Sequence, residues 1–314
     1  MSSLLRRVLD LVARAVALLS WEALARAGAA LGWLAGSVLR IRRAAVEAAM
    51  RRASVGDPRG VAASMYRSLG AGVFELLWLA GARPAERDAA IRAHVAMDED
   101  LAVALHEACE RGPVVLAASH TANWELAAFG AARSLGGQGR RLAVVVKPQS
   151  VGVFHAFCTH LREACGLVLI APEGAFGAAR KSLAAGDVIA MPIDQVPGRA
   201  RHGVGVPFLG AQALADRAPA ALARATGATL LVVAASREGR RQRIHLLAEL
   251  PPHTRGESRA NAWITHATRE ATRVLDGFVN AEPASWLWLH RRWRAPLDVR
   301  EERRAPLVVP PVPG

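Results

Sequence analysis

The chain has 314 residues, 52% of them hydrophobic, so it can bury a full core, either as one large domain with a helical appendage or as two domains. Its net charge of +13 favours an anionic partner: a membrane surface, a phosphorylated substrate or nucleic acid. Only Lys147 and Lys181 are lysines, so arginine carries the charge, which indicates phosphate binding or an arginine-rich genome. Aromatic residues make up only 5%, which argues against stacking on nucleic-acid bases.

The three cysteines, Cys109, Cys158 and Cys165, argue against a disulfide framework and a zinc site, because their number is odd and no C-x-x-C pair occurs. A reducing environment fits this pattern. We expect the cysteines to act as small buried apolar side chains.

Residues 4–40 are apolar but interrupted by charges, and the longest uncharged stretch, 27–39, is too short to span a bilayer. Charged residues recur at helical spacing opposite Leu5, Val8, Val12 and Val16, which predicts an amphipathic helix. A second helix is predicted around residues 28–39. These helices either contact a membrane from one side, with Trp21 and Trp33 as interfacial anchors, or pack on the domain as ordinary helices.

A basic cluster follows at Arg40, Arg42, Arg43, Arg51 and Arg52. It suits anionic lipid headgroups, although such a run is also typical of a solvated face. Further along, we expect a turn at 57–60, a helix over 61–81, and one or two helices within 85–111.

From residue 113 onward, strands and helices alternate, which predicts an α/β fold with a largely parallel mixed sheet flanked by helices. The predicted strands are 113–118, 142–147, 167–171, 187–193, 229–235 and 243–248, and the predicted helices are 124–135, 152–165, 175–185, 215–226 and 258–280. We therefore expect three parts: an N-terminal helical, membrane-associating segment (1–110), an α/β domain (111–296) and a Pro/Arg-rich tail (297–314).

The central motif is His120 with Glu125, between the apolar run 114–118 and a predicted helix. Such strand-to-helix junctions often carry the chemistry of α/β folds. On a continuous helix the two side chains would lie roughly 140° apart, so they can pair only if His120 precedes the helix. Ser119 and Thr121 are candidate caps for its start. The pair is either a general base with an orienting carboxylate, or a core histidine and a solvated glutamate.

The chain lacks G-x-S-x-G, G-x-G-x-x-G, Walker and H-E-x-x-H motifs, which removes support for a serine hydrolase, a Rossmann oxidoreductase, a P-loop enzyme and a zincin. Instead, several blocks occur in order that resemble those of the bacterial lipid A late acyltransferases, in the lysophospholipid acyltransferase superfamily. The blocks are His120-Thr121-Ala122-Asn123-Trp124-Glu125, Lys147-Pro148, Arg162 with Gly166, Asp194-Gln195, Val206-Pro207-Phe208-Leu209-Gly210, Gly227-Ala228 with Arg237, and the run from Trp286 to Arg294.

The resemblance implies transfer of a fatty acyl chain from acyl carrier protein or coenzyme A to a hydroxyl of a membrane glycolipid, with no metal and no acyl-enzyme. His120 would be the general base and Glu125 would orient it. Arg162 matches a residue facing substrate phosphate or the oxyanion, and Asp194 one near the acceptor; alternatively, Arg162 and Asp194 form a buried structural pair. The other implied substrate-binding residues are Asn123, Arg237, His290 and Arg291, although Asn123 can equally cap or pack. For His290, Arg291 and Arg292 the resemblance implies packing beneath the active site or a phosphate contact, and the alternative is a solvated basic turn.

The resemblance also implies lipopolysaccharide biosynthesis at the cytoplasmic face of a bacterial inner membrane, in peripheral or monotopic contact, without nucleic acid as a partner. The family's tyrosine-arginine pair is here Val146-Lys147, and its usual threonines after Phe208 are here Ala213 to Arg217. These departures leave the acceptor open: a lipid A precursor is expected, with a phospholipid, an aminolipid or a mannosylated lipid as alternatives. A non-catalytic anionic-lipid-binding protein and a lipid hydrolase are the rival functions.

Overall fold

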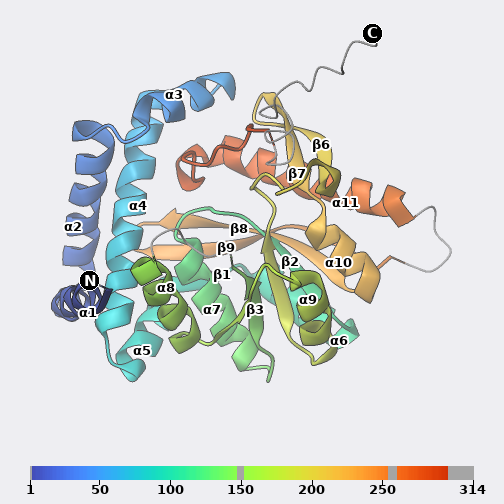
Figure 1. Ribbon diagram of the computed structural model, residues 1–314, viewed down its shortest axis with the longest axis horizontal. Helices are drawn as coiled ribbons and strands as arrows, with labels where there is room; N and C mark the ends of the chain where they lie inside the picture. The colour runs from blue at the N-terminus through green and yellow to red at the C-terminus, as the bar shows by residue number, and fades with distance from the viewer. Residues whose placement is uncertain (1, 147–151, 254–259, 296–314) are drawn as a thin grey trace, which may run out of the picture.

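A seven-stranded sheet forms the centre of the protein in the computed structural model, which describes residues 2–146, 152–253 and 260–295 (Figure 1). The strand order is β1-β9-β8-β2-β5-β3-β4, and every neighbouring pair is parallel except β8 and β9. The strands are β1 Val95–Met97, β2 Val114–Ala118, β3 Leu142–Val145, β4 Leu167–Ile170, β5 Val188–Pro192, β8 Thr229–Glu238 and β9 Arg241–Leu250. The predicted α/β class with a largely parallel mixed sheet is therefore confirmed.

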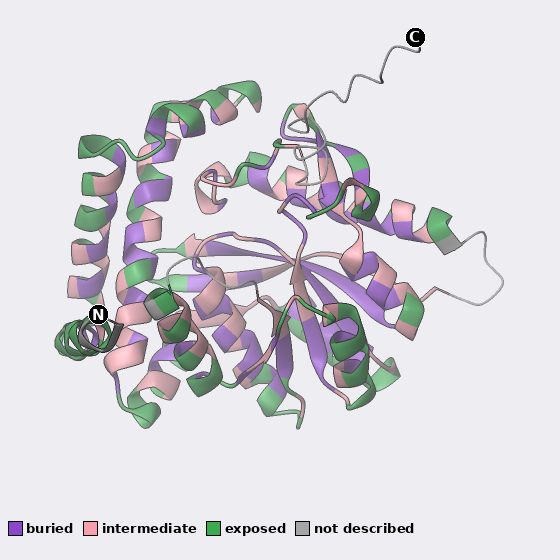
Figure 2. Ribbon diagram, in the orientation of Figure 1, coloured by how far each residue is buried: buried purple, intermediate pink, exposed green. Residues whose placement is uncertain are grey.

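Helices cover both faces of the sheet, so its central strands are buried on both sides (Figure 2). Along β2, Val115 and Ala117 pack into one apolar cluster while Val114 and Leu116 pack into the other. This explains why a central parallel strand has an unbroken apolar sequence. One cluster draws on α9 Ala175–Ala184, α10 Ala218–Thr226 and α11 Ala260–Ala281; the other draws on α5 Pro84–His94, α6 Glu99–Arg111, α7 Trp124–Gly136 and α8 Gly152–Ala164.

The N-terminal helices lie beside the sheet (Figure 1). They are α1 Ser2–Val16, α2 Trp21–Trp33, which continues into a π-helical turn at Leu34–Val38, α3 Arg43–Arg52 and α4 Pro58–Gly81. A Cβ at Gly32 would lie 2.0 Å from the carbonyl oxygen of Tyr66, so α2 can approach α4 this closely only with glycine there. The amphipathic N-terminal helix is confirmed.

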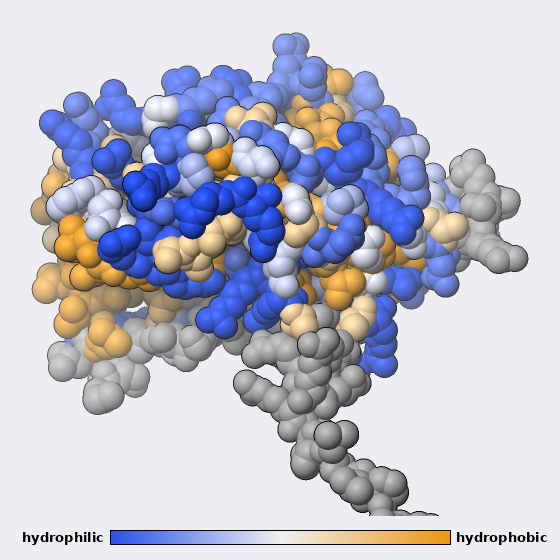
Figure 3. Space-filling model, turned by 90° about the horizontal axis from the view of Figure 1, so that it is seen from above, coloured by the Kyte–Doolittle hydropathy of each residue, from blue (hydrophilic) through white to orange (hydrophobic). Residues whose placement is uncertain are grey.

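The exposed apolar side chains of α1, α2 and the turn that follows form what we call the N-terminal apolar surface. It includes Leu5, Val8, Leu11, Val12, Leu18, Trp33, Val38 and Leu39. Figure 3 shows an orange area on the left, over these helices. Within the described ranges, no helix is both long and apolar enough to cross a membrane. The adjacent basic cluster is exposed apart from Arg43, which is buried and binds Glu47.

Most predicted elements match the structure within a few residues, but the helix predicted over 215–226 is partly wrong. Residues up to Asp216 belong to β7 Ala211–Asp216, which pairs with β6 Gly203–Phe208 in a separate antiparallel hairpin, and α10 begins at Ala218. The glycines and proline of β6 and the alanines of β7 are poor strand formers, so local propensity does not reveal this hairpin.

Three smaller differences concern element boundaries. The turn predicted at 57–60 is the first turn of α4, because Asp57 accepts a hydrogen bond from the Gly60 amide and Pro58 starts the helix. The second N-terminal helix begins at Trp21 rather than near residue 28. Strand β1 was not predicted; it joins the sheet although it precedes residue 111. Residues 147, 258 and 259, the Lys147-Pro148 block and the tail lie outside the described residues.

Candidate active site

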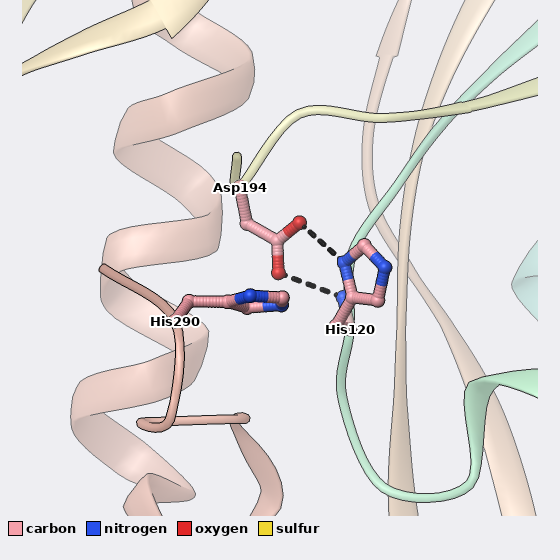
Figure 4. Close-up of side chains that lie close together, drawn as sticks. All are labelled: His120, Asp194 and His290. Atoms are coloured by element: carbon pink, nitrogen blue, oxygen red, sulfur yellow. Dashed lines mark hydrogen bonds and ion pairs between the residues drawn. The ribbon is translucent and has the colours of Figure 1, made fainter. Parts of the chain in front are cut away.

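His120 and Asp194 meet because they follow adjacent parallel strands. Ala118 at the end of β2 lies opposite Pro192 at the end of β5, and each functional residue comes two positions later. His120 Nδ1 lies 2.8 Å from Asp194 Oδ1, and the His120 main-chain N–H donates to Asp194 Oδ2 at 2.8 Å (Figure 4). One carboxylate therefore fixes both the ring and the main chain of His120.

Asp194 is fully buried, and its Oδ2 also accepts a hydrogen bond from Trp286 Nε1 at 3.0 Å. Burial opposes ionisation of this carboxyl group, but the charge and hydrogen bonds of His120 outweigh it and hold the pKa of Asp194 well below its usual range. An ionised carboxylate on Nδ1 favours the imidazole tautomer with its proton on that nitrogen. The lone pair then lies on Nε2, as a general base requires.

The Nε2 side of His120 faces groups that can contact a substrate. Gln195 Nε2 lies 3.3 Å from His120 Nε2, and the Trp124 ring lies edge-on at 5.1 Å between centroids. The His120 side chain is 17% exposed. The reacting nitrogen is thus sheltered, yet the side chain still reaches the surface.

His290 lies next to Asp194 and contacts the His120 ring, with ring centroids 4.7 Å apart and planes at 76° (Figure 4). Burial is the main cause that lowers the pKa of His290 to about 4, so the ring is neutral at pH 7. Ligand atoms of His120, Asp194 and His290 all lie within 4.8 Å of one another, as in sites that can hold a metal ion. Both oxygens of Asp194 accept hydrogen bonds from His120 or Trp286, whereas the buried His290 Nε2 has no hydrogen-bond partner among the described residues.

Glu125 lies in the first turn of α7, and its carboxylate forms an ion pair with Arg162 of α8. Arg162 Nε donates to Glu125 Oε2 at 2.9 Å, and Nη2 donates to Oε1. This hydrogen bonding raises the pKa of Arg162. In the structure the Nδ1 partner of His120 is thus Asp194, and the Glu125 carboxylate pairs with Arg162. The alternative Arg162–Asp194 pair is wrong, because strand order places Asp194 beside His120.

Asn123 and Arg237 belong to a different network, built on the buried Glu75 of α4. Asn123 Nδ2 donates to Glu75 Oε2 at 2.8 Å, and Arg237 donates to both Glu75 oxygens at 2.7 and 2.9 Å. Asn123 Oδ1 also accepts from the Leu126 amide and is the N-cap of α7, a role predicted for Ser119 or Thr121. These contacts tie α4 to the turn after His120, so both residues position the site.

The segment 286–294, which we call the C-terminal strap, covers this turn. The Leu287 amide donates to the carbonyl of His120 at 3.0 Å, and Thr121 forms a β-bridge with Trp286. His290 and the exposed Arg291 lie on the wall of an open pocket of about 260 Å³, together with Asp194 and Gln195. Trp286 and Gln195 belong to the motif blocks, but the sequence predicted no role for them or for Glu75.

A second, apolar pocket of about 80 Å³ lies between the sheet and helices α6 and α7. Ser119 and Trp124, on either side of His120 in sequence, line it together with leucine, valine and alanine side chains. The structure thus places an arginine-lined pocket and an apolar pocket at residues next to the same histidine. Of the three cysteines predicted to be buried, Cys109 and Cys165 are buried, whereas Cys158 is only partly buried. Burial raises the pKa of Cys165 to about 12.

Residues 8–295 match the model of an acyltransferase family, so the protein is an acyltransferase. That family is described as bacterial lipid A biosynthesis acyltransferase, and the chain belongs to it over nearly its whole length. No curated protein matches the chain.

Proposed function

We propose that the protein moves a fatty acyl chain from a thioester of acyl carrier protein or coenzyme A to a hydroxyl of a lipid A precursor, with His120 as general base. The observation that carries this proposal is the contact between His120 Nδ1 and the buried carboxylate of Asp194, in a chain of this family. A thioester is already activated, so a base and hydrogen-bond donors suffice, and the reaction needs no cofactor.

In the proposed mechanism, His120 Nε2 takes the proton of the acceptor hydroxyl while its oxygen attacks the thioester carbonyl carbon. Asp194 stabilises the imidazolium that forms. The tetrahedral intermediate collapses, the carbon–sulfur bond breaks, and the thiolate takes the proton from Nε2. Asp194 thus fills the role that the sequence assigned to Glu125. Because Glu125 neutralises Arg162, we propose that this pair positions the start of α7 and do not assign the oxyanion to Arg162.

The apolar pocket supports a binding place for the acyl chain. Transfer of a methylene group from water to such a surface is favourable by about 0.8 kcal/mol. The pocket meets the catalytic turn at Ser119 and Trp124, so a chain lying in it would bring its thioester to that turn. We propose that the part of the acyl chain nearest the thioester occupies this pocket.

The N-terminal apolar surface supports membrane contact from one side, and the family leads us to propose the cytoplasmic face of the inner membrane as the place of this contact. Leu11 and Leu18 are 69% and 88% exposed, which costs free energy in water and is offset at a lipid interface. The exposed arginines Arg40, Arg42, Arg51 and Arg52 follow directly and suit anionic headgroups. This arrangement would present the site to a lipid acceptor.

The deciding experiment measures acyl transfer from an acyl-carrier thioester to a lipid A precursor by wild-type and folded His120→Ala protein. We expect His120→Ala to lower the rate by about 10²–10⁴-fold, the usual effect of losing a general base. Wild-type turnover retained in this variant would overturn the mechanism. Free fatty acid released without acceptor would favour a hydrolase, and turnover with a phospholipid, aminolipid or mannosylated lipid alone would reassign the acceptor. Lipid binding without any turnover would favour a binding protein.

A further inference from the structure

The open pocket beside His120 concentrates positive charge. Four arginines line it: Arg42, Arg291, Arg292 and Arg294. Its one lining carboxylate is Asp194, which also binds His120 and Trp286, so the arginines outnumber the carboxylates in the lining. Strong positive charge in a concave site favours an anionic ligand.

Arg292 gives this pocket a built cationic centre. The residue is only 1% exposed, and its Nη1 donates to the Leu214 carbonyl at 2.5 Å. Among the described residues its Nε and Nη2 have no hydrogen-bond partner. Burial lowers the pKa of Arg292 to about 10, so the guanidinium is still charged at pH 7. A buried charge with unused donors is costly unless a ligand satisfies it.

Two arginines near this centre, Arg42 and Arg52, contact the C-terminal strap. Arg42 donates to the carbonyl of Leu289, which fixes the strap at the pocket wall. Arg52 lies over the Trp293 ring at 3.8 Å, and Trp293 Nε1 donates to the Phe208 carbonyl at 3.2 Å. These contacts on both sides of residues 290–292 keep the strap in register, so the pocket is pre-organised for its ligand.

Phosphate is the anion that this chemistry fits. A guanidinium binds phosphate through two parallel hydrogen bonds, and several guanidiniums can share its oxygens and its charge. We propose that the arginine pocket binds a substrate phosphate group while the reacting atoms lie at His120. This proposal rests on the proposed function and deepens it. The phosphate belongs either to the acceptor glycolipid or to the phosphopantetheine arm of the thioester donor.

Binding is tested first without catalysis, by calorimetric titration of inorganic phosphate into the full chain at constant ionic strength. We expect Arg292→Lys and Arg294→Ala to weaken phosphate binding at least tenfold, because the first loses the planar fork and the second loses a charge at the exposed rim. Arg111→Ala is the matched control, since Arg111 is an exposed arginine before the amino end of β2, at the opposite end of the strand from His120. Equal affinity in wild type and Arg294→Ala, which should fold whatever the fate of Arg292→Lys, would overturn the proposal.

Kinetics then distinguish the source of the phosphate. A KM for a phosphorylated acceptor that rises at least tenfold in Arg294→Ala, with no change for the dephosphorylated acceptor, assigns the pocket to the acceptor. A rise for acyl-coenzyme A, with no change for the phosphate-free acyl-N-acetylcysteamine thioester, assigns it to the donor. Unchanged KM values for all four substrates overturn the assignment. Phosphate binding without any acyl transfer would refute the proposed function and leave the pocket standing.

Discussion

Asp194 holds His120 at two points, through the ring Nδ1 and through the main-chain N–H, and both contacts are 2.8 Å long. A single carboxylate thus sets the tautomer of the base and also the position of its backbone. Removing the negative charge of Asp194 should leave the fold intact, but the His120 imidazolium would no longer be stabilised.

We therefore expect Asp194→Asn to lower kcat by about 10²–10⁴-fold, with little change in donor KM. Steady-state rates on folded protein check this. Asp187→Asn is the matched control. Asp187 is a buried carboxylate that binds Arg141 and lies just before β5, the strand that Asp194 follows. In His120→Ala, adding Asp194→Asn should cost little more, since residues acting as a unit are not additive. Full activity in Asp194→Asn would show that a group other than the Asp194 carboxylate orients His120.

Glu125 and Arg162 should behave as a structural pair. Their side chains are only 15% and 11% exposed, so removing either one should cost about 3–5 kcal/mol of stability. The double variant Glu125→Leu/Arg162→Met should regain much of that loss, because no unpaired charge remains. Denaturant unfolding of the two single variants and the double variant measures this. A folded Glu125→Gln protein that loses more activity than Asp194→Asn would instead make Glu125 the partner of the base.

His290 should make stability depend on pH. The pKa of this ring falls from 6.5 to about 4 on folding, mainly through burial, so the unfolded chain binds a proton that the folded protein does not. Stability is therefore full above pH 6.5 and falls as the pH drops toward 4, by up to about 3 kcal/mol. Unfolding at pH 7.5 and pH 5 should show a smaller loss in His290→Gln than in wild type. His106→Gln, at an exposed site on α6, should retain the wild-type dependence.

Filling the apolar pocket should change the preferred acyl chain length. Ala131 of α7 lines this pocket, whereas Ala132 is equally buried and does not. We expect Ala131→Leu to shift donor preference at least tenfold toward shorter chains, because the added methyl groups occupy acyl space. Relative kcat/KM for a series of acyl thioesters measures the shift. An identical shift in Ala132→Leu would show general overpacking rather than a specific chain site.

Membrane binding should depend on the N-terminal apolar surface. We expect Leu11→Asp with Leu18→Asp, and likewise deletion of residues 1–40, to weaken binding to anionic vesicles by tenfold or more. High salt should also weaken it, because screening reduces attraction to the headgroups. Vesicle sedimentation measures both effects. Val103→Asp is the control, since Val103 is a half-exposed valine on α6. Wild-type protein that stays vesicle-free at low salt would contradict the prediction.

Local sequence was enough to predict the central strands, because buried parallel strands such as β2 read as apolar runs bounded by turn residues. The helix predicted over 124–135 also placed His120 before a helix, and the structure agrees, with Asn123 rather than Ser119 or Thr121 as the N-cap of α7. The hairpin β6–β7 could not be predicted this way, because its stability comes from pairing with its partner and packing on the core rather than from strand propensity.

Strand order was the missing information at the site. Glu125 is five residues from His120 and Asp194 is 74 residues away, so spacing alone points to Glu125 and gives no sign of Asp194. Only the pairing of β2 with β5 brings Asp194 to Nδ1. Similarly, Glu75 gives no local signal, because its partners Asn123 and Arg237 come from distant parts of the chain.

The strap also bears on how the enzyme matures during synthesis. The His120 carbonyl accepts a hydrogen bond from the Leu287 amide, and Asp194 accepts one from Trp286, so both residues have partners more than ninety positions later. A nascent chain that has completed the parallel strands still lacks these contacts. A chain that stops before residue 286 therefore carries His120 and Asp194 without the segment that supplies these two contacts.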